Sequence, residues 1–464
     1  MAWALLALAL AQPGASAEAA TRGARTPPAP SRAAGAPADL APPDDCGPLP
    51  PDEPQLASAP AEPGVQPSAP DADAGPGAIV PLPASTAAPE ASAVSGEALL
   101  VLPKGPDGRV PTEFTLAPGA TVASSFFSPV LCATLVRVVG PAGMAPGELV
   151  LEAPAGAVTV PNDRYEGAQE APPRPAPAEA GGDDPYRPLQ WGLASAGAER
   201  AWTVTDGAGA RVAVLDSAPD AAHRDLAGVR VAALPDAGDA PVGVHGTLMA
   251  GVVRAVAHNG FGIAGLAPGA ELIGIAACRP RAGSAPDECR LFELLRGVDL
   301  AWEQGAQVLN LSLVGPPNAL LRKAMDRVDQ LGAIVVAAAG NEAVSEPRYP
   351  AAYPSVIGVG AVDRAGAPYA RGNRGPWVEI VAPGVEILST VPGGAFSFGD
   401  GTSLAAAHVS GVLALAVAAS DGDARAARAA FFAAAQARSA SPGNRAAPLP
   451  AACDVLAQLG RPCP

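Results

Sequence analysis

Short apolar runs alternate with helix-like patterns over the second half of the chain. The runs are continuous, as expected of strands buried on both faces, and they fall at 211–215, 271–277, 307–313, 333–338 and 356–361. Between them, apolar residues recur on one helical face at Leu291, Leu294, Leu295, Val298 and Trp302, and again at Leu321, Ala324, Met325, Val328 and Leu331. This alternation predicts the α/β class, with a mostly parallel β-sheet sandwiched by helices. In such sheets the reactive groups gather where the strands end.

The first part of the chain has a different pattern. Residues 18–95 are dominated by Pro, Ala, Asp and Ser without a sustained period, which predicts a disordered segment. Strand-like runs set off by Gly and Pro then indicate a small β-rich or α/β domain over 96–166. A Pro-rich linker is predicted over 167–183, the main α/β domain over 184–440, and a C-terminal tail over 441–464.

An apolar run of eight residues, 4–11, precedes the small residues Ala15, Ser16 and Ala17. The run is too short to span a bilayer, so we interpret 1–17 as a signal peptide of an exported protein, the alternative being a disordered Ala-rich tail. The longest later apolar stretch, 404–419, is interrupted by His408, Ser410 and Gly411. It therefore predicts a buried core helix, and we expect no transmembrane anchor.

Composition removes several classes of function. The chain has 464 residues with a formal net charge of -15 and only 16% charged residues, so a basic face for nucleic acid is not expected. Aromatic residues make up 4%, which is low for a carbohydrate-binding or base-stacking surface.

Six cysteines in an exported chain indicate disulfides. Two pairs are close in sequence, Cys278 with Cys289 and Cys453 with Cys463, so local bridges are the simplest interpretation. Cys46 and Cys132 either pair or stay free. Because no Cys/His spacing of a zinc ligand set occurs, we expect no structural zinc.

An acid, a base and a nucleophile stand where the α/β pattern locates reactive groups. Asp216 ends the first strand, His245 opens a helix, and Ser403 opens the apolar helix. A serine hydroxyl needs an imidazole to take its proton, and the imidazole needs a carboxylate to fix its tautomer. An α/β-hydrolase would run Ser, Asp, His, but the only histidine after Ser403 is His408, so that alternative fails on chain order.

Several motifs in this order resemble the subtilases, the subtilisin-like serine proteases. The matching segments are 212–217, 223–226, 245–251, 338–341 and 401–411, within a region of about 184–440. The resemblance implies a mostly parallel sheet between helices and a serine-type endopeptidase activity. It also implies Ser403 as nucleophile, His245 as general base, Asp216 as its orienter, and Asn341 with the Ser403 amide as donors to the oxyanion, which leaves His223 and His408 with structural roles.

The sequence departs from the family pattern at several positions. Ala218, Val244, Leu248 and Ala407 replace frequent family residues, but none of these changes removes a reacting atom. Val314 stands where the family usually has Gly, and it should narrow the primary pocket. Arg348 falls where the pocket floor would lie, which suggests a preference for small or acidic side chains, unless Arg348 points to solvent. The resemblance implies a substrate-binding set of Ser312, Leu313, Val314, Gly315, Gly340 and Arg348.

The resemblance also suggests a metal and a partner. Asp184, Asp225 and Asn259 match positions of calcium-binding members, so we expect a structural Ca²⁺ and no cofactor for catalysis, the alternative being solvated loop carboxylates. The segment 96–166 would then be a prodomain that blocks the cleft of its own enzyme.

The first hypothesis is therefore a secreted or periplasmic serine endopeptidase that acts on polypeptides and is made as a zymogen. A catalytically silent subtilase-like binding domain is the alternative, and a non-proteolytic acyl hydrolase is a third interpretation.

Overall fold

A parallel β-sheet forms the centre of the larger folded region in the computed structural model. The structure describes residues 93–104, 113–167, 174–175, 183–234, 240–281, 286–438 and 446–464, and the predicted signal peptide lies outside them. The strand order of the sheet is β20-β17-β16-β15-β13-β8-β10-β9, and every pairing is parallel. The strands are β8 (Arg211–Asp216), β9 (Arg230–Ala232), β10 (Glu271–Ala276), β13 (Val308–Leu311), β15 (Ile334–Ala338), β16 (Val356–Val362), β17 (Ile380–Pro383) and β20 (Ala447–Pro448).

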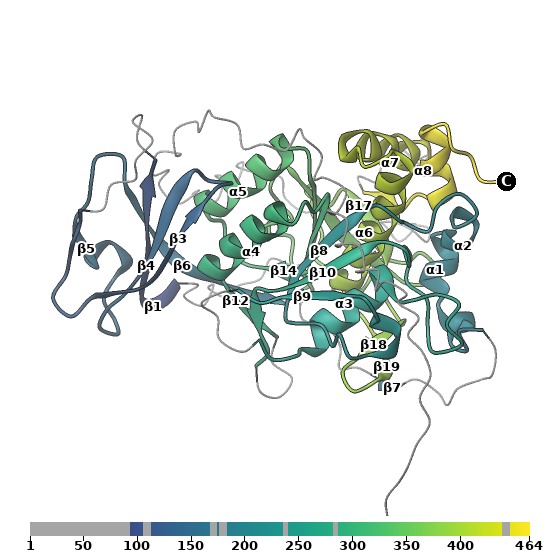
Figure 1. Ribbon diagram of the computed structural model, residues 1–464, viewed down its shortest axis with the longest axis horizontal. Coiled ribbons are helices and arrows are strands. Elements are labelled where there is room, and N and C mark those ends of the chain that lie inside the picture. The colour runs from purple at the N-terminus through teal and green to yellow at the C-terminus, as the bar shows by residue number, and fades with distance from the viewer. Residues whose placement is uncertain are drawn as a thin grey trace, which may run out of the picture. The chain divides into compact units, whose positions relative to one another are not determined.

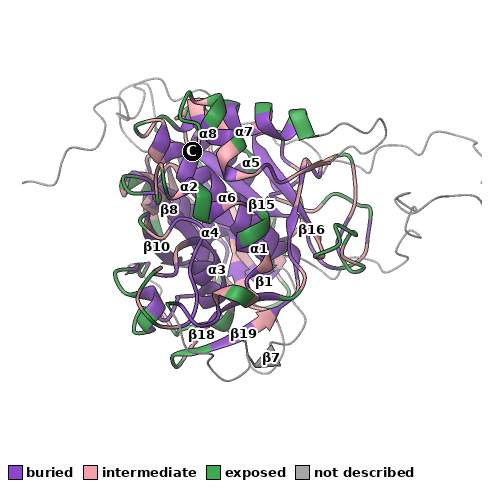
Figure 2. Cartoon of the chain, turned by 90° about the vertical axis from the view of Figure 1, so that its right-hand side faces the viewer, coloured by how far each residue is buried: buried purple, intermediate pink, exposed green. Residues whose placement is uncertain are grey.

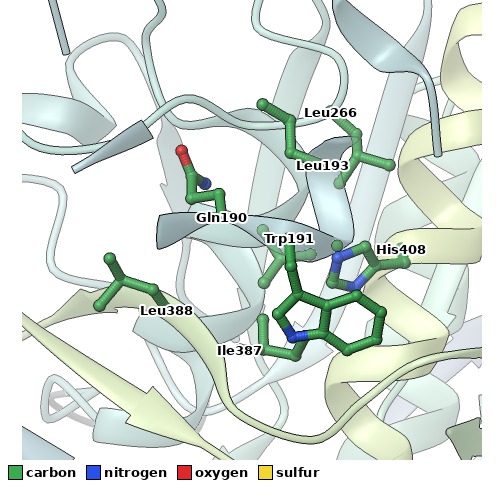
Figure 3. Close-up of a pocket in the computed structure, with 9 residues that line it drawn as sticks. Gln190, Trp191, Leu193, Leu266, Ile387, Leu388 and His408 are labelled. Carbon is green, nitrogen blue, oxygen red and sulfur yellow. The ribbon is translucent and has the colours of Figure 1, made fainter. Parts of the chain in front are cut away.

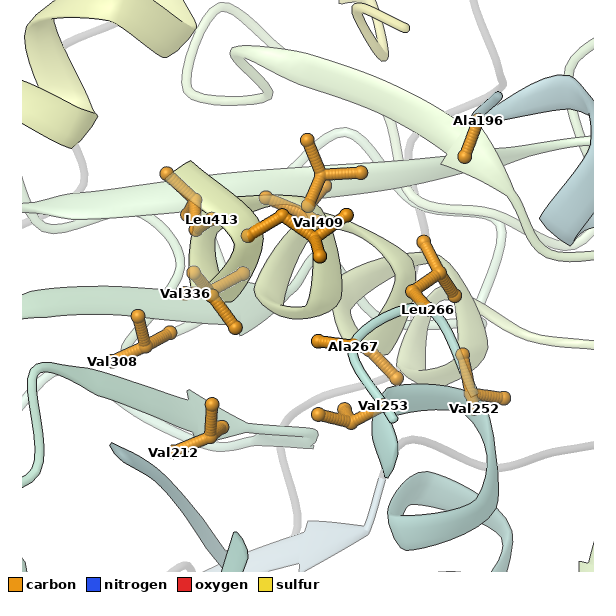
Figure 4. Packing of buried hydrophobic residues seen from close by; sticks show 14 of the residues in the cluster. Ala196, Val212, Val252, Val253, Leu266, Ala267, Val308, Val336, Val409 and Leu413 are labelled. Carbon is orange, nitrogen blue, oxygen red and sulfur yellow. The ribbon is translucent and has the colours of Figure 1, made fainter. Parts of the chain in front are cut away.

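Helices cover both faces of this sheet because its strands are apolar on both sides. Val212 and Val214 of β8 pack into one core cluster, and Ala213 and Leu215 pack into the other. Figure 4 shows the first cluster, in which strand valines meet residues of α3 and α6. The α/β class is thus confirmed. The helices are α1 (Trp191–Ser195), α2 (Ala198–Ala201), α3 (Val244–Arg254), α4 (Leu291–Glu303), α5 (Ala319–Gln330), α6 (Thr402–Ala419), α7 (Ala424–Arg438) and α8 (Ala452–Gln458), with short 3₁₀ turns η1 (Pro146–Glu148), η2 (Arg187–Leu189) and η3 (Arg224–Leu226).

Helix α6 is buried along nearly its whole length, as Figure 2 shows. It is long and apolar enough to cross a membrane, but 94% of that apolar window lies inside the protein. Small residues permit close packing on every side: a Cβ at Gly411 would lie only 2.6 Å from Cβ of Leu266. The helix therefore has the character of the core helix that the sequence predicts.

Antiparallel strands form a second sheet at the N-terminal side, and we call residues 93–167 the N-terminal domain. The order is β11-β12-β6-β1-β4-β3, with β14 paired to β6. The domain is β-rich in its described residues, and Val94 of β1, ahead of the expected boundary at 96, is already buried. The strands are β1 (Ala93–Pro103), β3 (Thr121–Ser128), β4 (Ala133–Val139), β6 (Val158–Gly167), β11 (Cys278–Arg279), β12 (Glu288–Arg290) and β14 (Leu313–Val314), with a small pair β2 (Thr115–Leu116) and β5 (Val150–Glu152).

The N-terminal domain packs on helix α4, next to which its strands lie in Figure 1. The Phe126 and Phe292 rings meet edge to face, with centroids 5.0 Å apart. Arg137 forms an ion pair of 2.8 Å with Glu293, and Ser128 Oγ donates a hydrogen bond of 2.9 Å to Asp299. Apolar and polar contacts thus both join the N-terminal domain to α4.

The C-terminal residues correct one expectation. The stretch 441–464 was predicted to be a tail, but its described part adds β20 to the edge of the main sheet beside β17, and α8 packs on α2 and α7. Val455 and Leu456 are fully buried, which explains why the segment folds onto the domain. In the predicted linker, β7 (Arg174–Pro175) pairs with β19 (Ala395–Gly399), which itself pairs with β18 (Ile387–Val391).

The two local disulfides are confirmed, Cys278–Cys289 and Cys453–Cys463. Cys132 is also disulfide-bonded. The other cysteine left open by the sequence, Cys46, lies outside the described residues.

Gly192 offers a test of packing around α6. Figure 3 shows the small cavity where His408 lies near Trp191, and a Cβ at Gly192 would overlap Nε2 of this histidine. Gly192→Ala should therefore lower the free energy of unfolding by about 1–3 kcal/mol, measured by urea denaturation. In a protein that also carries His408→Ala, Gly192→Ala should lower the free energy of unfolding by less than it does in the wild type. Ser195→Ala on the same helix is exposed and serves as control; an equal loss in it would contradict the packing argument.

Candidate active site

Asp216 lies at the carboxyl end of β8, in the middle of the parallel sheet, and is buried. Its carboxylate is held by the next residue, since the Ser217 amide donates to Oδ1 at 2.7 Å and Ser217 Oγ donates to the same atom at 3.3 Å. Ser217 Oγ also accepts a hydrogen bond of 3.1 Å from the Gly246 amide in the first turn of α3. The strand end and the helix start are thereby fixed together.

His245 lies in the first turn of α3, between a carboxylate and a hydroxyl. Its Nδ1 donates to the two carboxylate oxygens of Asp216 at 2.9 and 2.8 Å. The Ser403 hydroxyl donates to its Nε2 at 3.1 Å. The structure therefore brings the predicted acid, base and nucleophile into one line of hydrogen bonds, the geometry that proton transfer from the hydroxyl to the ring requires.

Ser403 lies in the first turn of α6 and is buried. A chain of buried polar side chains ties this turn to β13. Ser312 Oγ donates to the Ser403 carbonyl at 3.3 Å, Asn310 Nδ2 donates to Ser312 Oγ at 2.9 Å, and Ser410 Oγ donates to Asn310 Oδ1 at 2.9 Å. Because these groups satisfy each other away from water, they fix α6 in register against the sheet.

Asn341 follows β15 and is buried. Its Oδ1 accepts two hydrogen bonds of 3.0 Å from Thr402, one from the amide and one from the hydroxyl. Thr402 Oγ1 in turn accepts a hydrogen bond of 2.9 Å from the Gly340 amide. Thr402, the residue next to Ser403, thus orients the side-chain amide of Asn341. The amide oxygen faces Thr402, and the NH₂ group of the same amide faces away from it.

Strand β14 runs beside the candidate site and carries part of the predicted substrate-binding set. Leu313 pairs with Gly167 and Val314 with Glu166 in antiparallel register. A Cβ at Gly340 would lie 3.1 Å from Cγ1 of Val314, so the valine fills space beside that glycine. Gly315 exchanges backbone hydrogen bonds of 2.8 and 3.1 Å with Tyr349, which brings the neighbouring Arg348, partly exposed, alongside the strand.

The three predicted metal ligands lie in one loop cluster. Asp184 Oδ1 accepts a hydrogen bond of 3.1 Å from the Asn259 amide, and Asn259 Nδ2 donates to Asp225 Oδ1 at 2.8 Å. Both carboxylates are fully buried. Burial above all, together with the negative charge of Asp184, raises the pKa of Asp225 to about 6.

The remaining histidines have structural surroundings. Burial lowers the pKa of His408 to about 4, and its Nδ1 donates to the Leu404 carbonyl at 2.8 Å. Burial also lowers the pKa of His223, whose Nε2 donates to the Ala395 carbonyl at 3.0 Å. His258 Nδ1 lies 2.6 Å from Asp183, and with Asp184 these two form a group able to hold a metal ion. Asp183 and His258 were not among the metal ligands predicted from the sequence.

Comparison with known proteins gives this geometry a family. The family model described as the Subtilase family matches residues 207–446, more than half of the chain. The chain belongs to the subtilase family. The resemblance seen in the motifs is thus confirmed, and with it the assignment to the serine endopeptidases among the hydrolases.

Similar subtilases include several bacterial enzymes. A thermophilic serine proteinase of Bacillus sp. (strain AK1) is 37% identical over 239 residues, which cover 50% of this chain and 58% of that protein. Thermitase of Thermoactinomyces vulgaris is 35% identical over 243 residues, covering 50% of this chain and 84% of thermitase. Subtilisin E of Bacillus subtilis (strain 168) is 35% identical over 217 residues, covering 45% of this chain and 55% of subtilisin E.

Three further residues of this subtilase belong to the site, and sequence reasoning did not single them out. Ser217 and Thr402 orient Asp216 and Asn341, and their signal was their place next to the motif residues. Asp287 lies outside every motif, yet its carboxylate is close to Asp216 and His245. Only the folded chain brings it there.

Proposed function

We propose that this subtilase is a secreted serine endopeptidase that is made as a zymogen and cleaves polypeptides through Asp216, His245 and Ser403. The observation that supports this most is the line of hydrogen bonds from the Asp216 carboxylate through the His245 ring to the Ser403 hydroxyl. The small residues at 15–17 after an apolar run support export.

In the proposed mechanism, Ser403 Oγ attacks the carbonyl carbon of the scissile peptide bond and His245 Nε2 takes the hydroxyl proton. Asp216 stabilises the imidazolium that forms and holds the tautomer with hydrogen on Nδ1. The oxyanion of the tetrahedral intermediate accepts hydrogen bonds from Asn341 Nδ2 and from the Ser403 amide at the start of α6. His245 then gives its proton to the leaving amine, and water releases the acyl group by the reverse sequence.

The triad can be tested by substitution. Ser403→Ala, His245→Ala and Asp216→Asn should each lower peptide turnover by several orders of magnitude, and the double variant of Ser403 and His245 should lose little more than either single one, because the residues act as a unit. A fluorophosphonate should label the wild type at Ser403. A folded but unlabelled protein would instead support the silent binding domain, and turnover of esters without peptides would support the acyl hydrolase.

The zymogen proposal rests on the position of β6 in the peptidase part of the chain. The end of β6 lies between two short strands, paired with β12 on one side and with β14 on the other. Gly167, its last residue, is next to the candidate base, since a Cβ there would lie 3.7 Å from Cε1 of His245. The N-terminal domain thus presents its end as an extended strand, in the way a peptide substrate adds to a sheet edge.

Cleavage should therefore occur a short way beyond Gly167. Purified wild type should lose its N-terminal region and show a new N-terminus soon after this residue, within 168–184, by mass spectrometry. Ser403→Ala should keep the uncut precursor because the strand stays bound and no acyl enzyme can form. Ser195→Ala, an exposed serine far from the motifs in sequence, should process like wild type. Processing of Ser403→Ala at the same bond in a protease-free preparation would argue against self-cleavage.

Release of the N-terminal domain should depend on pH through Asp299. This buried residue of α4 accepts hydrogen bonds from Ser128 Oγ at 2.9 Å and from the Val130 amide at 3.1 Å, both in the N-terminal domain. Burial raises its pKa to about 7 from an ordinary value of 3.8, against the lowering effect of those hydrogen bonds and of Arg296, while Glu303 adds to the rise. Removal of the domain restores water to the carboxylate, so the bound state holds more protons between these two pKa values.

Binding of the N-terminal domain should consequently weaken as the pH rises from about 4 to about 7, by at most about tenfold per pH unit. After self-cleavage, activity should appear faster at pH 8 than at pH 5.5, measured with a substrate added to samples brought to one assay pH. Asp299→Asn should flatten this dependence, whereas the exposed Asp421→Asn should leave it unchanged. A steep dependence that persists in Asp299→Asn would assign it to another group.

We further propose that Asp184, Asp225 and Asn259 hold a structural Ca²⁺. Two buried carboxylates side by side fit a divalent cation, and their oxygens keep lone pairs beyond those that accept backbone amides. The ion would supply positive charge that stabilises the loop, and no catalytic step uses it.

Calcium removal should lower the melting temperature, and a Ca²⁺ concentration of about a hundred times Kd should add about 2.7 kcal/mol to the free energy of unfolding. Without the ion, stability should fall as the pH rises towards 6, because the raised pKa of Asp225 makes its ionisation costly in the folded state. Asp225→Asn should abolish the calcium effect. Asp363→Asn, which changes a carboxylate that caps turn amides elsewhere, should retain it. Equal melting curves with chelator and with Ca²⁺ would exclude the site.

A further inference from the structure

Asp287 lies beside Asp216 and His245 in the candidate active site and takes no part in the mechanism above. It directly precedes β12, and its carbonyl accepts a hydrogen bond of 2.9 Å from the Gly167 amide. Its carboxylate, the Asp216 carboxylate and a ring nitrogen of His245 all lie within 4.8 Å of one another. The residue that holds the backbone of an incoming strand thus also presents a carboxylate beside the base.

The space next to this carboxylate is where a side chain at position 167 would go. A Cβ built on Gly167 would lie 3.7 Å from three atoms, namely Cβ and N of Asp287 and Cε1 of His245. These are ordinary van der Waals distances, and the φ angle of Gly167 lies outside the left-handed region, so a Cβ is accommodated here without a backbone shift. A larger side chain there starts out between Asp287 and His245.

One oxygen of the Asp287 carboxylate has an unmet demand for a donor. Oδ2 is buried and makes no hydrogen bond with any described residue. Burial and the nearby negative charge of Asp216 raise the pKa of Asp287. A buried carboxylate oxygen without a donor is unfavourable, and a charged donor is the partner that improves it most.

The chemistry of the bound residue follows from this demand. A lysine or arginine side chain at position 167 brings donors and a positive charge to two neighbouring carboxylates. An apolar chain of equal length covers Oδ2 without pairing it, and an acidic chain is repelled by both carboxylates. Glycine, which the precursor carries at this position, fits the backbone register but leaves the carboxylate unpaired.

We propose that Asp287 is a specificity-determining residue that selects a basic side chain at the substrate position occupied by Gly167 in the precursor. This inference rests on the proposed peptidase function and adds a substrate class to it. The precursor strand and a substrate would then bind through different contacts. The enzyme's own strand is held by backbone pairing and by the contacts of its domain. A basic substrate gains an ion pair with Asp287 that Gly167 cannot make.

The test uses quenched fluorescent peptides that copy residues 163–172 of the chain and vary only position 167, as Gly, Lys, Arg, norleucine or Glu. Norleucine matches lysine in length and lacks its charge. Mature wild-type enzyme should cleave the Lys peptide with a kcat/KM about tenfold or more above that of the norleucine peptide. In Asp287→Asn and Asp287→Ser this ratio should fall to within about threefold of one. The exposed Asp421→Asn, with the same loss of charge, should keep the wild-type ratio.

The ratio is the readout, because it compares two substrates on one enzyme and does not depend on how much active enzyme each preparation holds. The wild-type enzyme could label at Ser403 with a fluorophosphonate and yet cleave the Lys and norleucine peptides with a kcat/KM ratio near one. That result would overturn the selection by Asp287 and leave the peptidase function standing. A ratio that survives in both Asp287 variants would do the same. Wild type that neither labels nor cleaves any peptide overturns both proposals.

Discussion

Burial of α6 along nearly its whole length is the constraint on which the rest of the molecule depends. A helix surrounded on all sides needs small residues at its contacts and a partner for every polar group, and α6 meets both conditions with its alanines and with the link from Ser410 to Asn310. Because the helix cannot shift, its first turn carries Ser403 and Thr402 to fixed positions. The positions of the proposed nucleophile and of Thr402, which supports Asn341, are thus consequences of core packing.

Under the proposed function, the same backbone surface binds the substrate and the inhibitory N-terminal domain. Strand β6 completes a sheet with β12 and β14, and a slip of one residue would turn its alternate side chains to the opposite face. Tyr165 resists such a slip because it is fully buried and its hydroxyl donates to the Pro316 carbonyl at 3.3 Å. A short peptide in the place of β6 would make only the strand pairing. The N-terminal domain makes the contacts with α4 in addition.

Sequence reasoning singled out groups that follow a rule of position and did not single out those that depend on tertiary contact. Asp216, His245 and Ser403 stand at a strand end and in the first turns of two helices, which the apolar pattern marks. Asp287 acquires its surroundings only when β6, far away in sequence, pairs with β12. The C-terminal stretch 446–464 was misjudged because β20 and α8 are too short to show a period, and burial against other elements holds them.

Buried polar atoms without partners gather where the N-terminal domain meets the rest of the chain. Among the described residues, four such atoms lie along this contact, and they are Arg137 Nε, Asp287 Oδ2, Glu293 Oε2 and Asp299 Oδ2. Each group of this kind costs about 1–3 kcal/mol while it is kept from water. Beside the main sheet, by contrast, the buried side chains of Asn310 and Ser312 are paired with each other. Apolar packing and β-pairing therefore hold this contact against a polar cost that water removes on separation, which is the balance that the proposed release of the N-terminal domain requires.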